Sequence, residues 1–231
     1  MIDSRVNSTR LLADTLAKME HPPEVFLSAS AIGFYGHRGN ELMAESDGPG
    51  NDFISHVCQV WETSAQAAAD AGIRTALLRI GIVLSPGGRA LEKLLLPFQA
   101  GMGGQLGTGG QYMSWISIDD TIHAIYHAMF DPGISGPVNL VSPHPVTNRE
   151  FTAILARVLS RPAYFRVPEI AIKTAFGEMG VETVLSSTGS HRQCFHKPDS
   201  GSAIRTWNSP CVIFSAKQRV DKHVAVAYKR F

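Results

Sequence analysis

The sequence lacks the features of a membrane protein, of a nucleic-acid-binding protein and of a secreted, disulfide-bonded protein. Its three cysteines are odd in number and have no metal-ligand spacing, so neither a disulfide framework nor a metal site is indicated. The formal net charge of +1 provides no electrostatic footprint for nucleic acid or an anionic membrane. No apolar run approaches the roughly 18 residues of a membrane span, and the first residues lack the apolar core of a secretory signal. We therefore expect a cytoplasmic protein that binds neither nucleic acid nor membrane.

Glycine is absent from the chain before Ser28. A dinucleotide-binding fold begins with a strand and a glycine-rich turn that places the pyrophosphate on a helix N-terminus. The stretch 101–110 has six glycines in ten residues, but we expect it to lie between a helix and a strand, which is the wrong order. The sequence therefore contains no recognisable cradle for a pyrophosphate.

The composition is that of a globular protein, with 44% hydrophobic and 18% charged residues in a chain of 231. Apolar periodicity predicts strands that alternate with helices, which favours a parallel sheet built from βαβ units. The expected strands are 25–28, 75–84, 115–118 and 136–141. The expected helices are 1–20, 52–71, 90–100, 119–130, 147–159 and 168–179.

The stretch from Ser28 to Tyr35 joins an apolar strand to small hydroxyl residues, a glycine and a tyrosine. Ligands of open α/β sheets bind at the carboxyl ends of the strands, where this stretch is expected to lie. A tightly packed turn accounts for the same residues without any chemistry. Because of this expected position we regard the stretch as a candidate binding site, and a tightly packed turn remains the alternative.

Short motifs follow one another from residue 3 to about residue 187. They are Asp3–Val6, Ser28–Gly36, Trp61–Glu62, Leu78–Leu84, Pro97–Gly104, Trp115–Asp120, Pro143–Thr147 and Arg161–Pro162. In this order they resemble the extended short-chain dehydrogenase/reductases of the NAD-dependent epimerase/dehydratase class. The closer resemblance is to an atypical epimerase-like subfamily with a C-terminal domain of unknown function. It implies an α/β fold, with a Rossmann-like doubly wound parallel sheet that lacks its first βαβ unit and a small α-rich C-terminal appendage.

The resemblance also divides the chain. It implies a partial NAD(P)-binding Rossmann domain over 1–145 and a partial C-terminal domain over 146–187. Residues 188–231 match nothing in the family and are expected to form a divergent, poorly ordered tail. Members of the family begin earlier, with a glycine-rich βαβ unit. Its absence should expose a strand edge and an apolar face that favour self-association, so we expect a homo-oligomer.

Two catalytic candidates come from the resemblance, Ser30 and Tyr35. Active relatives use a Tyr-x-x-x-Lys pair, which corresponds here to Phe53 and Val57 and cannot perform acid–base chemistry. Ser30 corresponds to a serine that binds a substrate hydroxyl, although a turn serine bonded to its own backbone is the alternative. Tyr35 is the one hydroxylated ring nearby and would replace the missing tyrosine as proton donor, unless it packs beneath the loop.

The cofactor-binding candidates are Arg79, Ser28, Gly81, Ile82 and Val83. Arg79 is a charged residue in an otherwise apolar strand, and a buried guanidinium requires a partner. The resemblance assigns it to a cofactor phosphate or ribose, and the alternative is a structural ion pair. The three residues after Ile80 would offer backbone groups to a nicotinamide, or else form an ordinary buried strand.

Gln111 and Trp115 lie at the end of the glycine-rich stretch and are the substrate-binding candidates. Such a loop can close over a substrate, on which a tryptophan can stack. A core tryptophan is the alternative. Asp119 and Asp120 look like paired carboxylates, but helix capping explains them without chemistry.

The resemblance implies an oxidoreductase of the epimerase family that transfers hydride between NADP(H) or NAD(H) and a small carbonyl or sugar-nucleotide-like substrate. We expect weak cofactor binding and impaired activity, because the glycine-rich turn and the Tyr/Lys pair are both missing. The alternative is a non-catalytic binding module derived from the same fold.

Overall fold

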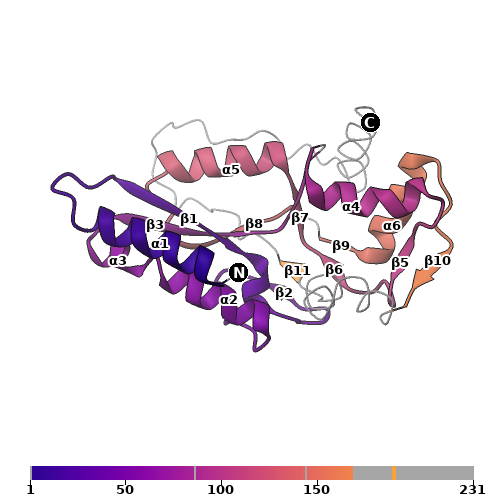
Figure 1. Ribbon diagram of the computed structural model, residues 1–231, viewed down its shortest axis with the longest axis horizontal. Helices are drawn as coiled ribbons and strands as arrows, with labels where there is room; N and C mark the ends of the chain where they lie inside the picture. The colour runs from indigo at the N-terminus through magenta and orange to yellow at the C-terminus, as the bar shows by residue number, and fades with distance from the viewer. Residues whose placement is uncertain (1, 86, 144, 169–188, 191–231) are drawn as a thin grey trace, which may run out of the picture.

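The computed structural model describes residues 2–85, 87–143, 145–168 and 189–190, which are built around a three-stranded parallel sheet. The sheet has the order β1 (Val25–Ala31), β3 (Arg74–Ile80), β8 (Gly136–Leu140). Helices α1 (Ile2–Leu16), α2 (Phe53–Thr63) and α3 (Gln66–Asp70) cover one face, and α5 (Ile118–Phe130) covers the other (Figure 1). The predicted doubly wound α/β architecture is therefore confirmed.

The central strand β3 shows why the sheet forms here. Its side chains are buried or half-buried along the whole strand, because helices cover both faces. On one face Leu78 packs with Val138 and Ala128 beneath α5. On the other face Phe26 packs against Ala13 and other small side chains of α1 and α3. The lack of polar alternation in the sequence thus has its cause in burial on two sides.

The strand predicted over 75–84 is two strands, because the chain changes sheets at Gly81. Strand β3 ends at Ile80, and β4 (Ile82–Leu84) pairs with β7 (Trp115–Ser117) instead. At the change, the Gly81 N–H donates to Leu140 O and the Ile82 N–H donates to Ser114 O. A Cβ at Gly81 would lie 2.6 Å from Ser114 O. Only glycine allows the two strands to approach this closely.

The helix predicted over 52–71 is also interrupted, between α2 and α3. The hydroxyl of Ser64 donates to Trp61 O at 2.6 Å, in competition with the helical pattern. The starts of the helices agree better with the sequence. Asp52 caps α2 by accepting from Ser55 N, and Ser117 caps α5 by accepting from Asp120 N. Helix α5 thus begins one residue before the predicted residue 119, and Asp119 and Asp120 lie in its first turn rather than at the cap.

A second group of elements lies beyond one end of the sheet and contains α4 (Arg89–Gln99) and α6 (Asn148–Leu159) (Figure 1). Its core joins Leu91 and Leu95 to Phe151 and Leu155, around Trp115. The short strands here are β5 (Gly104–Leu106), β6 (Tyr112–Met113), β9 (Val146–Thr147) and β10 (Phe165–Val167). Two further short strands, β2 (Leu42–Met43) and β11 (Gly189–Ser190), pair in parallel.

Of the predicted C-terminal appendage, the structure describes residues 146–168, which hold β9, α6 and β10. The helix expected over 168–179 and nearly all of the predicted tail lie outside the described residues. Within the described ranges, none of the helices has the length and apolar character needed to cross a membrane.

Gly81→Ala should destabilise the protein by about 1–3 kcal/mol, the usual cost of overpacking a rigid contact. The added methyl group would press on the Ser114 carbonyl, which belongs to the backbone and cannot rotate away. Urea unfolding measures the change. Gly48→Ala is the matched control, because a Cβ there meets nothing within 4 Å. Equal stability of the two variants would contradict the close approach.

Candidate functional site

The candidate site begins where β1 ends and the chain forms the short helix η1 (Ile32–Tyr35). Alternation along β1 sends Leu27 to the face beneath α5, whereas Phe26 packs on the face covered by α1 and α3. Ser28 and Ser30 share the face of Phe26 and are buried, at 4% and 3% exposure. The side chains of both serines therefore point to the face of the sheet that α1 and α3 cover.

A buried ion pair lies directly below these serines. Arg79 of β3 and Glu62 of α2 form a two-pronged contact, with Nε to Oε1 at 2.9 Å and Nη2 to Oε2 at 3.0 Å. The side chains are 3% and 8% exposed. Ser30 Oγ donates to the same Oε1 at 2.6 Å. The carboxylate thus receives three hydrogen bonds, which is how a charge is accommodated in an interior.

The pair extends across the sheet through Tyr35. Arg79 Nη1 donates to the Tyr35 hydroxyl at 2.9 Å, and that hydroxyl donates to Asn139 Oδ1 at 2.7 Å. Glu45 closes the network, because its carbonyl accepts from Arg79 Nη1 and its Oε1 accepts from the Asn139 N–H. The guanidinium also lies 3.5 Å from the ring centroid of Phe34, in a cation–π contact. The network joins β1, η1, α2, β3 and β8 at one end of the sheet.

The network sets the electrostatics of its own members. Burial raises the pKa of Tyr35 above its usual 10.0, against the lowering effect of the Arg79 hydrogen bond. Burial alone would lower the pKa of Arg79, but its bonds to Glu62 and Tyr35 outweigh this and hold the pKa above the usual value. Tyr35 is consequently a neutral hydroxyl and Arg79 a permanent cation at physiological pH.

The structure brings three predicted residues together, but their polar groups are already bonded within the protein: Arg79 donates to Tyr35, and Arg79 and Ser30 both donate to Glu62. Tyr35 is fully buried, and its proton is directed to Asn139. Arg79 has an ion-pair partner, Glu62, as expected if its role is a structural ion pair rather than cofactor binding. Their catalytic and cofactor-binding roles stay predictions, and any such role needs these hydrogen bonds to rearrange.

The other cofactor candidates differ in exposure. Ser28 is buried on the same face as Ser30. Gly81, Ile82 and Val83 are half-buried at the crossing between the two sheets. Their contact with a nicotinamide stays a prediction, but the N–H groups of Gly81 and Ile82 already donate to protein carbonyls.

Gln111 and Trp115 are buried among protein groups. Gln111 is 6% exposed and its side-chain amide donates to Leu106 O. Trp115 is 1% exposed within the core beneath α4 and α6, as the core alternative expects. Its indole Nε1 is a buried donor for which the described residues supply no acceptor. Their substrate-binding roles stay predictions.

Helix α2 presents a different pair of residues to the site than the sequence indicated. Ile54 and Cys58 pack with Phe34 and Tyr35 of η1, and a Cβ at Gly33 would lie 2.6 Å from Ile54 Cγ2. Phe53, by contrast, is 47% exposed. The predicted correspondence of Phe53 and Val57 with the Tyr/Lys pair stays a prediction, although Ile54 and Cys58 are the residues of α2 that contact η1. The chemical conclusion is unchanged, because isoleucine and a neutral thiol supply neither a phenol nor a cation.

Sequence reasoning missed the roles of Glu62, Asn139 and Glu45. A signal for Glu62 was present, because it shares the buried face of α2 with Ser55 and Cys58 at helical spacing. A lone carboxylate on an apolar helix face and a lone arginine in an apolar strand predict each other as partners. Asn139 and Glu45 gave no such signal, since they reach the network only through tertiary contacts.

With this geometry established, the comparisons identify the family. The model of the NAD dependent epimerase/dehydratase family matches residues 1–158, and the chain belongs to that family. It is 40% identical over 183 residues to the epimerase family protein Mb2239 of Mycobacterium bovis, and 37% identical over 182 residues to YfhF of Bacillus subtilis. These alignments cover 79% and 78% of this chain, and the chain spans 60% of the length of each relative.

Solved structures agree with the assignment. The human epimerase family protein SDR39U1 (isoform 2) with NADPH gives a TM-score of 0.78 at 30% identity, over 83% of this chain and 65% of that one. A nucleoside-diphosphate sugar epimerase of Corynebacterium glutamicum gives 0.60 at 29% identity, over 99% and 49%. The Rossmann-like fold expected from the motifs is thus confirmed.

Glu62→Ala should destabilise the protein by about 3–5 kcal/mol, because it leaves the buried Arg79 charge without its partner. The double variant Glu62→Leu/Arg79→Met should lose far less, since it removes both charges and keeps the volume. Urea unfolding distinguishes the two. A double variant as unstable as the single one would show that the charge itself is not the cause.

Cys58 should make stability depend on alkaline pH. Burial, with a smaller contribution from Glu62, raises the pKa of this thiol from 9.0 to about 11. The protonated Cys58 thiol contributes fully to the free energy of unfolding below pH 9, and this contribution disappears between pH 9 and 11. It is lost because the thiol ionises at lower pH in the unfolded chain than in the folded one, and it amounts to about 2–3 kcal/mol. Urea unfolding from pH 8 to 10.5, with Cys194 and Cys211 replaced by serine, should show a steeper loss than in the same background with Cys58→Ala. Parallel curves would contradict the shift.

Proposed function

We propose that the chain carries the substrate-side part of an epimerase-family oxidoreductase. In a complete protein it would transfer hydride between NADP(H) or NAD(H) and a small carbonyl or sugar-nucleotide-like substrate, with the cofactor supplying the redox chemistry. The main support is the likeness to a human relative solved with NADPH, over 83% of this chain. The family name supports a nicotinamide cofactor without distinguishing NAD from NADP. A cytoplasmic location belongs to the same proposal.

The described residues do not fit the pyrophosphate of such a cofactor. An anion site normally uses free N–H groups at a helix start, but α2 begins at Asp52 and α5 carries Asp119 and Asp120 in its first turn. These carboxylates repel a phosphate. Both cations of β3 are committed, Arg79 to Glu62 and Arg74 to backbone carbonyls at the end of α5 and after it. We therefore assign the pyrophosphate to a glycine-rich unit that these residues do not include.

A second candidate function is a non-catalytic binding module. It is favoured by one observation, the hydrogen-bond network in which Ser30 and Arg79 both donate to Glu62 and Arg79 also donates to Tyr35. Polar groups that satisfy one another in this way maintain a fold without any reaction. The two functions differ in whether supplying the missing unit restores binding and turnover.

Titration of the chain with NADPH and NADH by calorimetry should give dissociation constants above the millimolar range. Even a freed Arg79 would contribute only about 1–3 kcal/mol, whereas millimolar affinity requires about 4 kcal/mol. Fusing a family glycine-rich βαβ unit ahead of residue 1 should restore micromolar binding. Turnover should stay slow, because α2 offers no phenol or cation.

The controls separate the two functions. Glu62→Gln in the fusion should retain cofactor binding if Arg79 acts structurally, and Arg79→Ala should weaken it if the predicted cofactor contact exists. Micromolar binding by the unfused chain would show that the cofactor site has been misplaced. A folded fusion that binds no nicotinamide would favour the binding module.

A further inference from the structure

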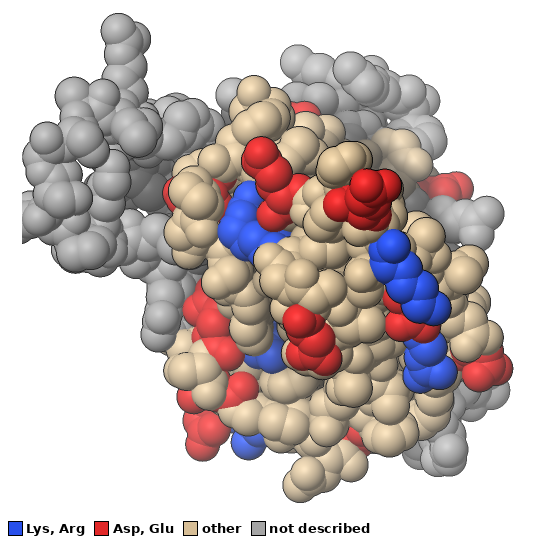
Figure 2. Space-filling model, turned by 90° about the vertical axis from the view of Figure 1, so that its left-hand side faces the viewer, with Lys and Arg blue, Asp and Glu red and all other residues tan. Residues whose placement is uncertain are grey.

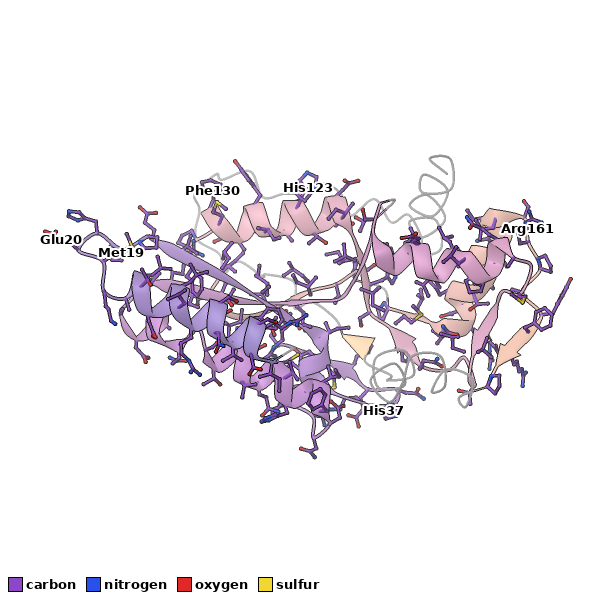
Figure 3. All side chains as sticks on the ribbon, viewed as in Figure 1. Met19, Glu20, His37, His123, Phe130 and Arg161 are labelled. Carbon is purple, nitrogen blue, oxygen red and sulfur yellow. The ribbon has the colours of Figure 1, made fainter. Side chains whose placement is uncertain are left out.

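The segment 36–50, between η1 and α2, forms a surface loop whose two ends touch. A Cβ at Gly36 would lie 3.1 Å from the Cα of Gly50. The Gly50 N–H donates to Phe34 O at 2.9 Å and closes the base of the loop. Figure 3 shows His37 of this segment on the opposite side of the molecule from α5. Compact loops with adjacent ends are Ω-loops, which are frequently functional, and we call residues 36–50 the Ω-loop.

The inner side of the Ω-loop supplies acceptors to the buried Arg79 network. The Glu45 carbonyl accepts from Arg79 Nη1 at 3.2 Å, and Glu45 Oε1 accepts from the Asn139 N–H at 3.0 Å. Met43 O accepts from Asn139 Nδ2 at 3.4 Å. The Met43 side chain packs in one cluster with Tyr35, which is fully buried. The loop therefore occupies three donors at this end of the sheet and covers the tyrosine.

One guanidinium fastens the base of the Ω-loop. Arg38 Nε donates to Tyr35 O at 2.9 Å. Arg38 Nη2 donates to Gly48 O at 3.0 Å and to Pro49 O at 2.9 Å. Elsewhere in the loop, β2 pairs with β11 over two residues. Arg38 thus joins the first residues of the loop to its last, through three carbonyls.

The Ω-loop has little apolar anchoring beyond these polar ties. Met43 is the one side chain of the loop that is buried. A Cβ at Gly39 or at Gly48 would meet nothing within 4 Å, so the backbone at both positions is free of packing. Segments with few buried apolar contacts open locally at far lower cost than the whole domain unfolds. The hydrogen bonds of Arg38 are therefore a large share of what keeps the loop in place.

We propose that the Ω-loop is a gate over the candidate site, that Arg38 holds it closed, and that substrate oxygens take the donors it occupies once it opens. The inference rests on the proposed function, because it assigns those donors to a substrate carbonyl or hydroxyl oxygen. Opening frees Arg79 Nη1 and both donor groups of Asn139 from the loop. It leaves the pair of Arg79 with Glu62 intact, so that no buried charge loses its partner. In the closed state, the loop oxygens take the place of the substrate.

Nitration of the full chain by tetranitromethane, read by peptide mass spectrometry, tests whether the gate covers Tyr35. Burial raises the pKa of Tyr35 above its usual 10.0, so the closed state holds a neutral phenol that reacts slowly. Arg38→Ala should raise the rate at Tyr35 about tenfold, the factor expected for one hydrogen bond from a charged donor. Arg38→Lys keeps the charge without the planar fork and should give an intermediate rate. Tyr126 is 64% exposed and serves as the internal reference.

Arg74→Ala is the matched control. Arg74 is also half-buried and also donates to three carbonyls, which belong to Ala128, Met129 and Ile134. It holds the end of α5 near Phe130, at the end of the molecule that faces the viewer in Figure 2. Basic and acidic groups are interspersed there, as the figure shows. This variant should leave the nitration of Tyr35 unchanged.

Hydrogen exchange supplies a second readout. The amides of the Ω-loop should exchange about tenfold faster in Arg38→Ala, whereas those of β3 should keep their protection because the opening is local. An unchanged nitration rate at Tyr35, an equal rise in Arg74→Ala, or a rise accompanied by lost protection in β3 would each overturn the gate. These readouts involve neither cofactor nor turnover. Failure of the proposed hydride transfer is therefore distinguishable from failure of the gate.

Discussion

The arrangement of the site follows from the burial of one guanidinium. Arg79 sits in the central strand at 3% exposure, where an unpaired charge is not tolerated. Glu62 must therefore come from α2 to meet it, which fixes that helix against the sheet. The same carboxylate orients Ser30, and the same guanidinium orients Tyr35. The position of each group depends on a charge that the interior has to neutralise.

Such a pair favours a particular arrangement more than it favours overall stability. The Coulombic gain of a buried pair roughly balances the desolvation of both ions, so apolar replacements of equal volume are often no less stable. A partly broken network is far worse, because each orphaned group carries its full desolvation cost. The network thus penalises any alternative packing of α2, η1 and β8. It also takes up the hydroxyl groups of Ser30 and Tyr35 that chemistry would need, and this is the physical tension in assigning them catalytic roles.

The sequence was informative where the secondary structure of a residue depends on its neighbours along the chain. The strand near Val25, the capping of α2 by Asp52 and the acidic first turn of α5 all follow from local patterns, and the structure has them. The change of sheet at Gly81 was not predicted, because its cause is the approach of Ser114, which lies between β6 and β7 and is distant in the sequence. Trp115 illustrates the same limit, since an indole in the core and an indole on a substrate share one sequence context.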